Sequence, residues 1–72
     1  MAERLNTFRK IFRKLENLEH ESLLKVAKEF GIQVLPRDTQ MSLCKKLRTE
    51  ARRLYQNEKV RLMEMANFLD RL

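Results

Sequence analysis

Apolar residues recur every three to four positions along most of the chain, which is the spacing of one face of an α-helix. In the first segment, from Ala2 to about Asn17, four basic residues project to the opposite side: Arg9, Lys10, Arg13 and Lys14. The apolar face of this segment consists of Leu5, Phe8, Ile11, Phe12, Leu15 and Leu18. The pattern predicts an amphipathic helix with a basic outer surface. A helix lying on an acidic membrane surface is the less favoured alternative, because these Phe and Leu side chains are needed for a core.

A second helix is expected to begin near residues 19–22, where the charge changes from basic to acidic. No glycine or proline marks this boundary, and His20 or Ser22 is the capping candidate. The residues predicted to face inward are Leu23, Leu24, Ala27 and Phe30. Gly31 then ends the helix, because glycine readily takes the left-handed conformation that closes one.

The stretch KEFGIQVLPRDTQMSL, residues 28–43, contains the only glycine and the only proline of the chain. Pro36 favours an extended conformation at Leu35, and Asp38 or Thr39 can accept a backbone N–H at the start of the next helix. Ile32, Val34 and Leu35 are too apolar for an ordinary surface loop. The stretch therefore predicts a short connector that folds inward between two helices.

A third helix is expected to start at Thr39 or Gln40. Its inner stripe is predicted to be Met41, Cys44, Leu47, Ala51, Leu54 and Tyr55. The apolar pattern loses phase at QNEK, residues 56–59, so the chain either continues as one long C-terminal helix or bends there into a fourth. The last segment is apolar on more than one side, which is typical of a helix covered on several faces.

The chain is thus expected to form one all-α domain, residues 1–72, built as a small bundle of three to four helices. At this size a monomer buries a modest core, so self-association is a candidate property. The residues predicted to form an interaction surface on the last segment are Val60, Met63, Met65, Phe68, Leu69 and Leu72. The alternative is that these residues complete a monomeric bundle.

Sixteen Lys and Arg against ten Asp and Glu give a formal net charge of +6, which favours an anionic partner. A lysine-rich solvated surface without a partner is the alternative explanation. The candidate nucleic-acid-binding residues form two groups: Arg9, Lys10, Arg13 and Lys14, and then Arg37, Lys45, Lys46, Arg48, Arg52 and Arg53. The few aromatic residues lie mostly at core spacing, so contact with a duplex backbone is favoured over base stacking on a single strand.

The chain lacks the residues that catalysis or cofactor binding requires. Its one histidine, His20, and its one cysteine, Cys44, are far apart in sequence and cannot supply a closed zinc site. One glycine cannot build a phosphate-binding loop. We therefore expect no enzyme activity, no metal, no cofactor and no small-molecule substrate.

Two features bear on location. A single cysteine forms no intramolecular disulfide, which favours a reducing intracellular compartment, cytoplasm or nucleus. No apolar run approaches the roughly 20 residues needed to span a bilayer, and MAERLNTFRKIF lacks the apolar core of a signal peptide. We expect no membrane association.

The segment ESLLKVAKEFGIQVLPRDTQMSLCKKL, residues 21–47, resembles the SAP domain and its LEM-like and Rho N-terminal relatives, which are helix–extended loop–helix modules. Leu23, Leu24 and Ala27 look like the first-helix core. Gly31 with Ile32 matches the helix stop, and Thr39 with Leu43 matches the start of the second helix. In SAP-like modules this loop and helix start approach the DNA backbone, so the resemblance implies DNA binding.

This segment also departs from the family pattern. The family's loop glycine is replaced by Leu35-Pro36-Arg37, its lysine by Gln40 and its glutamate by Ser42. Arg37, Lys45 and Lys46 are the basic residues in position to compensate.

Two functions follow as hypotheses. The first is a small module that binds nucleic acid, with DNA favoured over RNA, through phosphate contacts and without catalysis. The second is a helical protein-interaction module, an adaptor, regulator or assembly subunit, that binds an acidic protein or forms a homo-oligomer through its C-terminal helix.

Overall fold

The computed structural model describes residues 2–72, with side chains from Arg4 onward. It contains four α-helices: α1 (Ala2–Asn17), α2 (His20–Glu29), α3 (Gln40–Asn57) and α4 (Lys59–Arg71). The described part of the chain holds no strand. The prediction of an all-α bundle is therefore confirmed, and the break in the QNEK stretch falls at Glu58, where φ is −141° and ψ is 83°.

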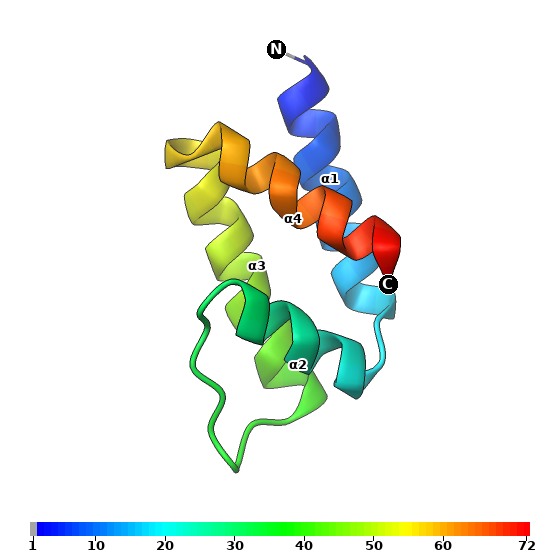
Figure 1. Ribbon diagram of the computed structural model, residues 1–72, viewed down its shortest axis with the longest axis vertical. Helices are drawn as coiled ribbons and strands as arrows, with labels where there is room; N and C mark the ends of the chain where they lie inside the picture. Colours follow the sequence, from blue (N-terminus) through cyan, green and yellow to red (C-terminus); the bar gives the residue numbers. More distant parts are fainter. Residues whose placement is uncertain (1) are drawn as a thin grey trace.

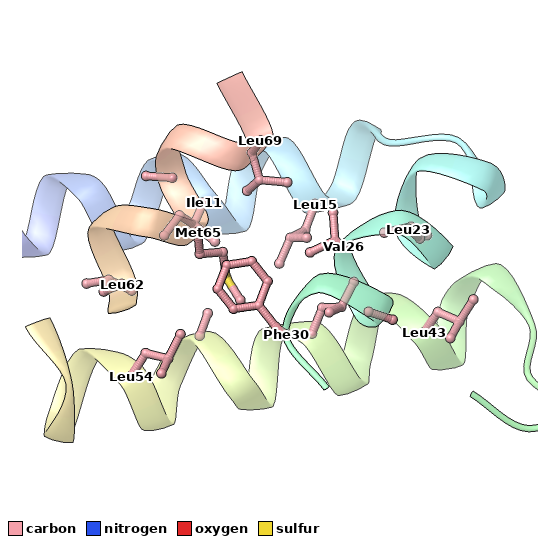
Figure 2. Close-up of a cluster of buried hydrophobic side chains, with 14 residues drawn as sticks. Ile11, Leu15, Leu23, Val26, Phe30, Leu43, Leu54, Leu62, Met65 and Leu69 are labelled. Atoms are coloured by element: carbon pink, nitrogen blue, oxygen red, sulfur yellow. The ribbon is translucent and has the colours of Figure 1, made fainter. Parts of the chain in front are cut away.

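Helices α1 and α3 lie side by side and run in opposite directions, and α4 crosses both of them (Figure 1). Helix α2 packs on α3 at the end where the connector of residues 30–39 projects. Side chains from all four helices meet in one core, which Figure 2 shows in close-up. The buried residues are Ile11, Leu15, Leu23, Val26, Ala27, Phe30, Leu43, Leu47, Ala51, Leu54, Leu62, Met65, Ala66 and Leu69.

The end of α2 is closed by the backbone at Gly31, as predicted. Gly31 has a φ of +68°. The Ile32 N–H donates to the Ala27 carbonyl at 2.8 Å, and the Gly31 N–H donates to the Lys28 carbonyl at 3.4 Å. These two hydrogen bonds satisfy carbonyls that a helix end leaves unpaired. Because the chain reverses at Gly31, Ile32 packs against the core.

The substitution Gly31→Ala is expected to lower the free energy of unfolding by about 1 kcal/mol, because an L-residue is disfavoured at positive φ. A Cβ at Gly31 would meet no atom within 4 Å, so the cost is conformational and not steric. Urea denaturation measures the change, and Gln33→Ala in the same connector is the matched control. A neutral Gly31→Ala would mean that the left-handed turn does not close α2.

The start of α3 is fixed by a reciprocal pair of hydrogen bonds. The Ser42 N–H donates to Thr39 Oγ1 at 3.2 Å, and the Thr39 N–H donates to Ser42 Oγ at 2.8 Å. Of the two candidates, Thr39 is therefore the helix cap. Asp38 instead organises the loop, since its carboxylate accepts hydrogen bonds from the Leu35 N–H at 2.8 Å and from Lys46 Nζ at 2.6 Å.

These contacts make Asp38 a source of pH-dependent stability. The Leu35 N–H, followed by Lys46, lowers the pKa of Asp38 to about 2. The unfolded chain has a carboxyl pKa near 3.9, so Asp38 stabilises the fold above about pH 4, and this contribution is lost as the pH falls through about 2. We expect Asp38→Asn to destabilise the protein near pH 5, by a margin that shrinks toward pH 2. Urea unfolding across this range measures it, with Glu19→Gln as the control; a margin independent of pH would contradict the assignment.

The predicted core differs from the observed core in three details. Met41 is 81% exposed, because the buried row of α3 is Leu43, Leu47, Ala51 and Leu54, and Met41 lies to one side of that row. Val26 is fully buried on α2, while Leu24 only packs against the edge of the core. In the connector Val34 is 39% exposed, so the loop folds inward at Ile32 and not at Val34.

Candidate nucleic-acid interface

Aromatic and guanidinium groups fill the seam between α1 and α3. The Phe8 ring lies 4.7 Å from the Tyr55 ring, measured between centroids. The guanidinium carbons of Arg48 and Arg52 lie 5.7 Å and 6.0 Å from the centroid of Phe12. Arg48 Nη2 also forms an ion pair with Glu16 Oε1 at 2.6 Å. These contacts hold the two helices side by side, so their outer faces form one continuous surface.

That surface carries five of the ten predicted nucleic-acid-binding residues, and we call it the α1–α3 basic face. Its members are Arg9, Arg13, Lys45, Arg48 and Arg52. From the 100° rotation per residue, Arg9 and Arg13 lie on the side of α1 remote from Ile11, and Lys45 and Arg52 lie on the side of α3 remote from Leu43 and Leu54. Among the described side chains, none of these four outward cations is in an ion pair.

Lys10 and Lys14 lie elsewhere, at the junction of α1 with α4. Both ammonium groups pair with the Asp70 carboxylate, Lys10 at 3.1 Å. Hydrogen bonds from Lys14 and then Lys10 lower the pKa of Asp70 below its usual value. These lysines therefore attach the C-terminal end of α4 to α1, and they do not share the face of Arg9 and Arg13.

The three remaining predicted cations lie on the connector and on the other flank of α3. Lys46 binds Asp38 and also donates to the Gln33 carbonyl at 3.1 Å, which ties α3 to the connector. Arg53 binds Glu50 at 2.8 Å and Glu58 at 2.7 Å, and both contacts raise its pKa. Arg37 is exposed in the turn of the connector. Five of the ten cations predicted to bind nucleic acid therefore lie on the α1–α3 basic face, and the other five lie elsewhere.

The predicted interaction surface on α4 divides into buried and exposed residues. Met65 is fully buried and Leu69 is 3% exposed, so both belong to the core of this chain, and their assignment to an interaction surface is corrected. Phe68 contacts Phe30 edge-to-face at 6.1 Å. Val60, Met63 and Leu72 remain exposed, at 77%, 48% and 46%. The alternative, in which this segment completes a monomeric bundle, therefore explains Met65, Leu69 and Phe68.

An open groove of about 650 Å³ lies at the end of the seam where α1 finishes and α3 begins. We call it the α1–α3 groove; its lining residues are Leu15, Glu16, Gln40, Met41, Cys44, Lys45 and Arg48. Sequence reasoning missed it because Met41 and Cys44 were placed in the core. Arg4, which stacks on Tyr55 at 5.1 Å, was also missed. The only sequence signal for the groove is that Met41 lies off the Leu43–Leu47 row.

Other chemistry is not assembled in the described residues. His20 is exposed at the start of α2, whereas the Cys44 thiol faces α1 and donates to the Leu15 carbonyl at 3.5 Å. Residues 2–72 contain no group of three or more His, Cys, Asp or Glu side chains placed to hold a metal ion. None of the four described helices combines the length and the apolar character needed to cross a bilayer.

Comparison of the chain with protein-family models, with curated proteins and with solved structures gave no match. The helix–extended loop–helix order of residues 21–47 is present in the fold. Its relation to SAP-like modules stays a prediction.

Proposed function

We propose that this protein binds nucleic acid by contacts between the α1–α3 basic face and backbone phosphates, without catalysis. The observation that carries the proposal is that Arg9, Arg13, Lys45 and Arg52 share one surface and have no carboxylate partner there among the described side chains. Glu16, the acid at the seam, is already paired with Arg48. Four unpaired cations on two adjoining helices would each neutralise a phosphate and release counterions.

Duplex DNA is the favoured form of the ligand. Bases of a single strand need free aromatic faces for stacking. On α1 the Phe8 ring packs on Tyr55 and the Phe12 ring is covered by Arg48 and Arg52. Phosphate contact therefore fits this surface better than stacking. The SAP-like order of residues 21–47 supports DNA over RNA and would add Arg37, which lies in the connector before α3.

The test is a fluorescence-anisotropy titration of a labelled DNA duplex at two salt concentrations, with an RNA duplex and a single strand for comparison. We expect the DNA duplex to bind at low salt and to lose affinity as salt rises, by about one unit of log–log slope for each phosphate contacted. Absence of duplex binding at low salt would refute the proposal.

The single free cysteine, Cys44, fits an intracellular site of action, in the cytoplasm or nucleus.

A second candidate function, self-association through α4, rests on the exposure of Val60 and Met63. Val60 and Met63 are three positions apart on α4, so their exposed side chains are neighbours on one face of the helix. The test is sedimentation velocity over a range of protein concentration, with the double substitution Val60→Ser and Met63→Ser. A concentration-dependent dimer that the double substitution abolishes supports this function, and a monomer at every concentration excludes it.

A further inference from the structure

The floor of the α1–α3 groove is apolar, and several polar groups beside it already have partners. Gln40 Nε2 donates to the Leu18 carbonyl at 2.9 Å, and the Cys44 thiol donates to the Leu15 carbonyl. Glu16 is paired with Arg48. A ligand group that enters the groove therefore finds Leu15, Met41 and Cys44 but few free hydrogen-bonding partners. An apolar side chain gives up no hydrogen bonds when it enters such a site, whereas a nucleobase would leave the polar groups of its edge without hydrogen-bond partners.

The rim of the groove is cationic and incompletely satisfied. Lys45 is exposed and has no ion pair among the described residues. Arg48 is paired with Glu16, so the uncompensated positive charge at the rim is that of Lys45. The rim is therefore complementary to a carboxylate that accompanies the apolar side chain.

Met41 forms one wall of the groove and is 81% exposed, on the first turn of α3. A methionine side chain is unbranched and adapts to the shape of a partner surface. Its position between the apolar floor and the solvent allows it to close over an inserted side chain. Met41 therefore extends the apolar lining that Leu15 and Cys44 form.

We propose that this groove binds an apolar side chain of an acidic amphipathic helix from a partner protein. The mode is helix-in-groove recognition, with apolar anchors on one face of the partner and carboxylates beside them. A second copy of this chain is a poorer occupant, because two chains of net charge +6 repel and the exposed Val60 is preceded by Lys59. The proposal does not rest on nucleic-acid binding, although both use Lys45 and Arg48.

The probe is a fluorescein-labelled peptide of leucine at helical positions i, i+3, i+4 and i+7 with glutamate elsewhere. The same peptide with lysine in place of glutamate is the ligand control. Anisotropy measures affinity, and alkylation of Cys44 by N-ethylmaleimide, followed by mass spectrometry, reports whether the groove is covered. Because Cys44 is the only cysteine, the alkylation signal has one source.

We expect Met41→Ser to weaken binding of the acidic peptide about tenfold and Lys45→Glu to weaken it about fivefold. The matched controls are Val34→Ser in the connector and Lys59→Glu at the start of α4, both on exposed residues, and these should stay within about twofold. Circular dichroism of each variant checks that the fold is kept. In the wild type the acidic peptide should slow alkylation of Cys44, and the lysine peptide should not.

Four results would overturn the proposal. The first is equal binding of the glutamate and lysine peptides, and the second is an affinity that Met41→Ser and Lys45→Glu leave unchanged. The third is unprotected Cys44 in the presence of saturating peptide. The fourth is protection of Cys44 by DNA duplex or by higher protein concentration without protection by the peptide, which would assign the groove to nucleic acid or to a second copy. The first three results concern the groove alone and do not test duplex binding by the α1–α3 basic face.

Discussion

Met65→Ala is expected to lower the free energy of unfolding by about 2–5 kcal/mol, whereas Met63→Ala on the same helix should change it by less than about 0.5 kcal/mol. Met65 is fully buried among the core residues that Figure 2 shows, so its removal leaves a cavity between α4 and the helices beneath it. Met63 is 48% exposed and loses little packing. Urea denaturation of the two variants measures the difference directly.

Comparison of Met63→Ala with Met65→Ala also distinguishes two interpretations of the C-terminal helix: an interaction surface, or a part of the bundle core. Equal and small effects at Met63 and Met65 would mean that α4 does not pack as described. Four buried residues come from α4: Leu62, Met65, Ala66 and Leu69. Truncation of the chain after Gln56 removes all four and is therefore expected to unfold the protein.

The second large effect concerns the α1–α3 basic face. Replacing Arg9, Arg13, Lys45 and Arg52 together with glutamine is expected to reduce the log–log salt slope of duplex binding by about 3 to 4 units, because each lost phosphate contact removes about 0.9. The fold should persist, since these residues lie outside the buried core. Anisotropy titrations at several salt concentrations give the slope, and circular dichroism checks the fold.

The matched control is a variant with the same loss of charge on other helices. Replacing Lys25, Lys28, Lys59 and Arg71 with glutamine also lowers the net charge from +6 to +2, and these four exposed cations lie on α2 and α4. We expect the control variant to keep most of the slope. Equal losses in the two variants would mean that net charge, and not the α1–α3 basic face, determines the affinity.

Local chemistry made most of the fold predictable. The 3.6-residue period identified the helices, the single glycine marked the end of α2, and Asp38 or Thr39 was expected to cap the start of α3, which Thr39 does. These signals act between residues within about one helical turn, so they can be read without knowing the tertiary structure. The break at Glu58 was less visible, because none of the residues in QNEK excludes a helix.

Long-range partners could not be predicted in the same way. From the sequence, Lys10 and Lys14 count as free basic residues. Their partner in the fold is Asp70, which is 60 positions from Lys10 and 56 positions from Lys14. Met65 and Leu69 appeared available to a partner because the surface that buries them is formed by other helices. Sequence therefore identified the cations and the apolar residues correctly but could not tell which of them the fold itself uses.

The most direct test of the central claim is a nuclear magnetic resonance titration of isotope-labelled protein with unlabelled DNA duplex at low salt. We expect chemical-shift changes to concentrate on the outer faces of α1 and α3, at Arg9, Arg13, Lys45 and Arg52, and to weaken as salt is added. Changes centred on α2 or on Val60 and Met63, or an unchanged spectrum at duplex excess, would contradict the assignment of nucleic-acid binding to the α1–α3 basic face.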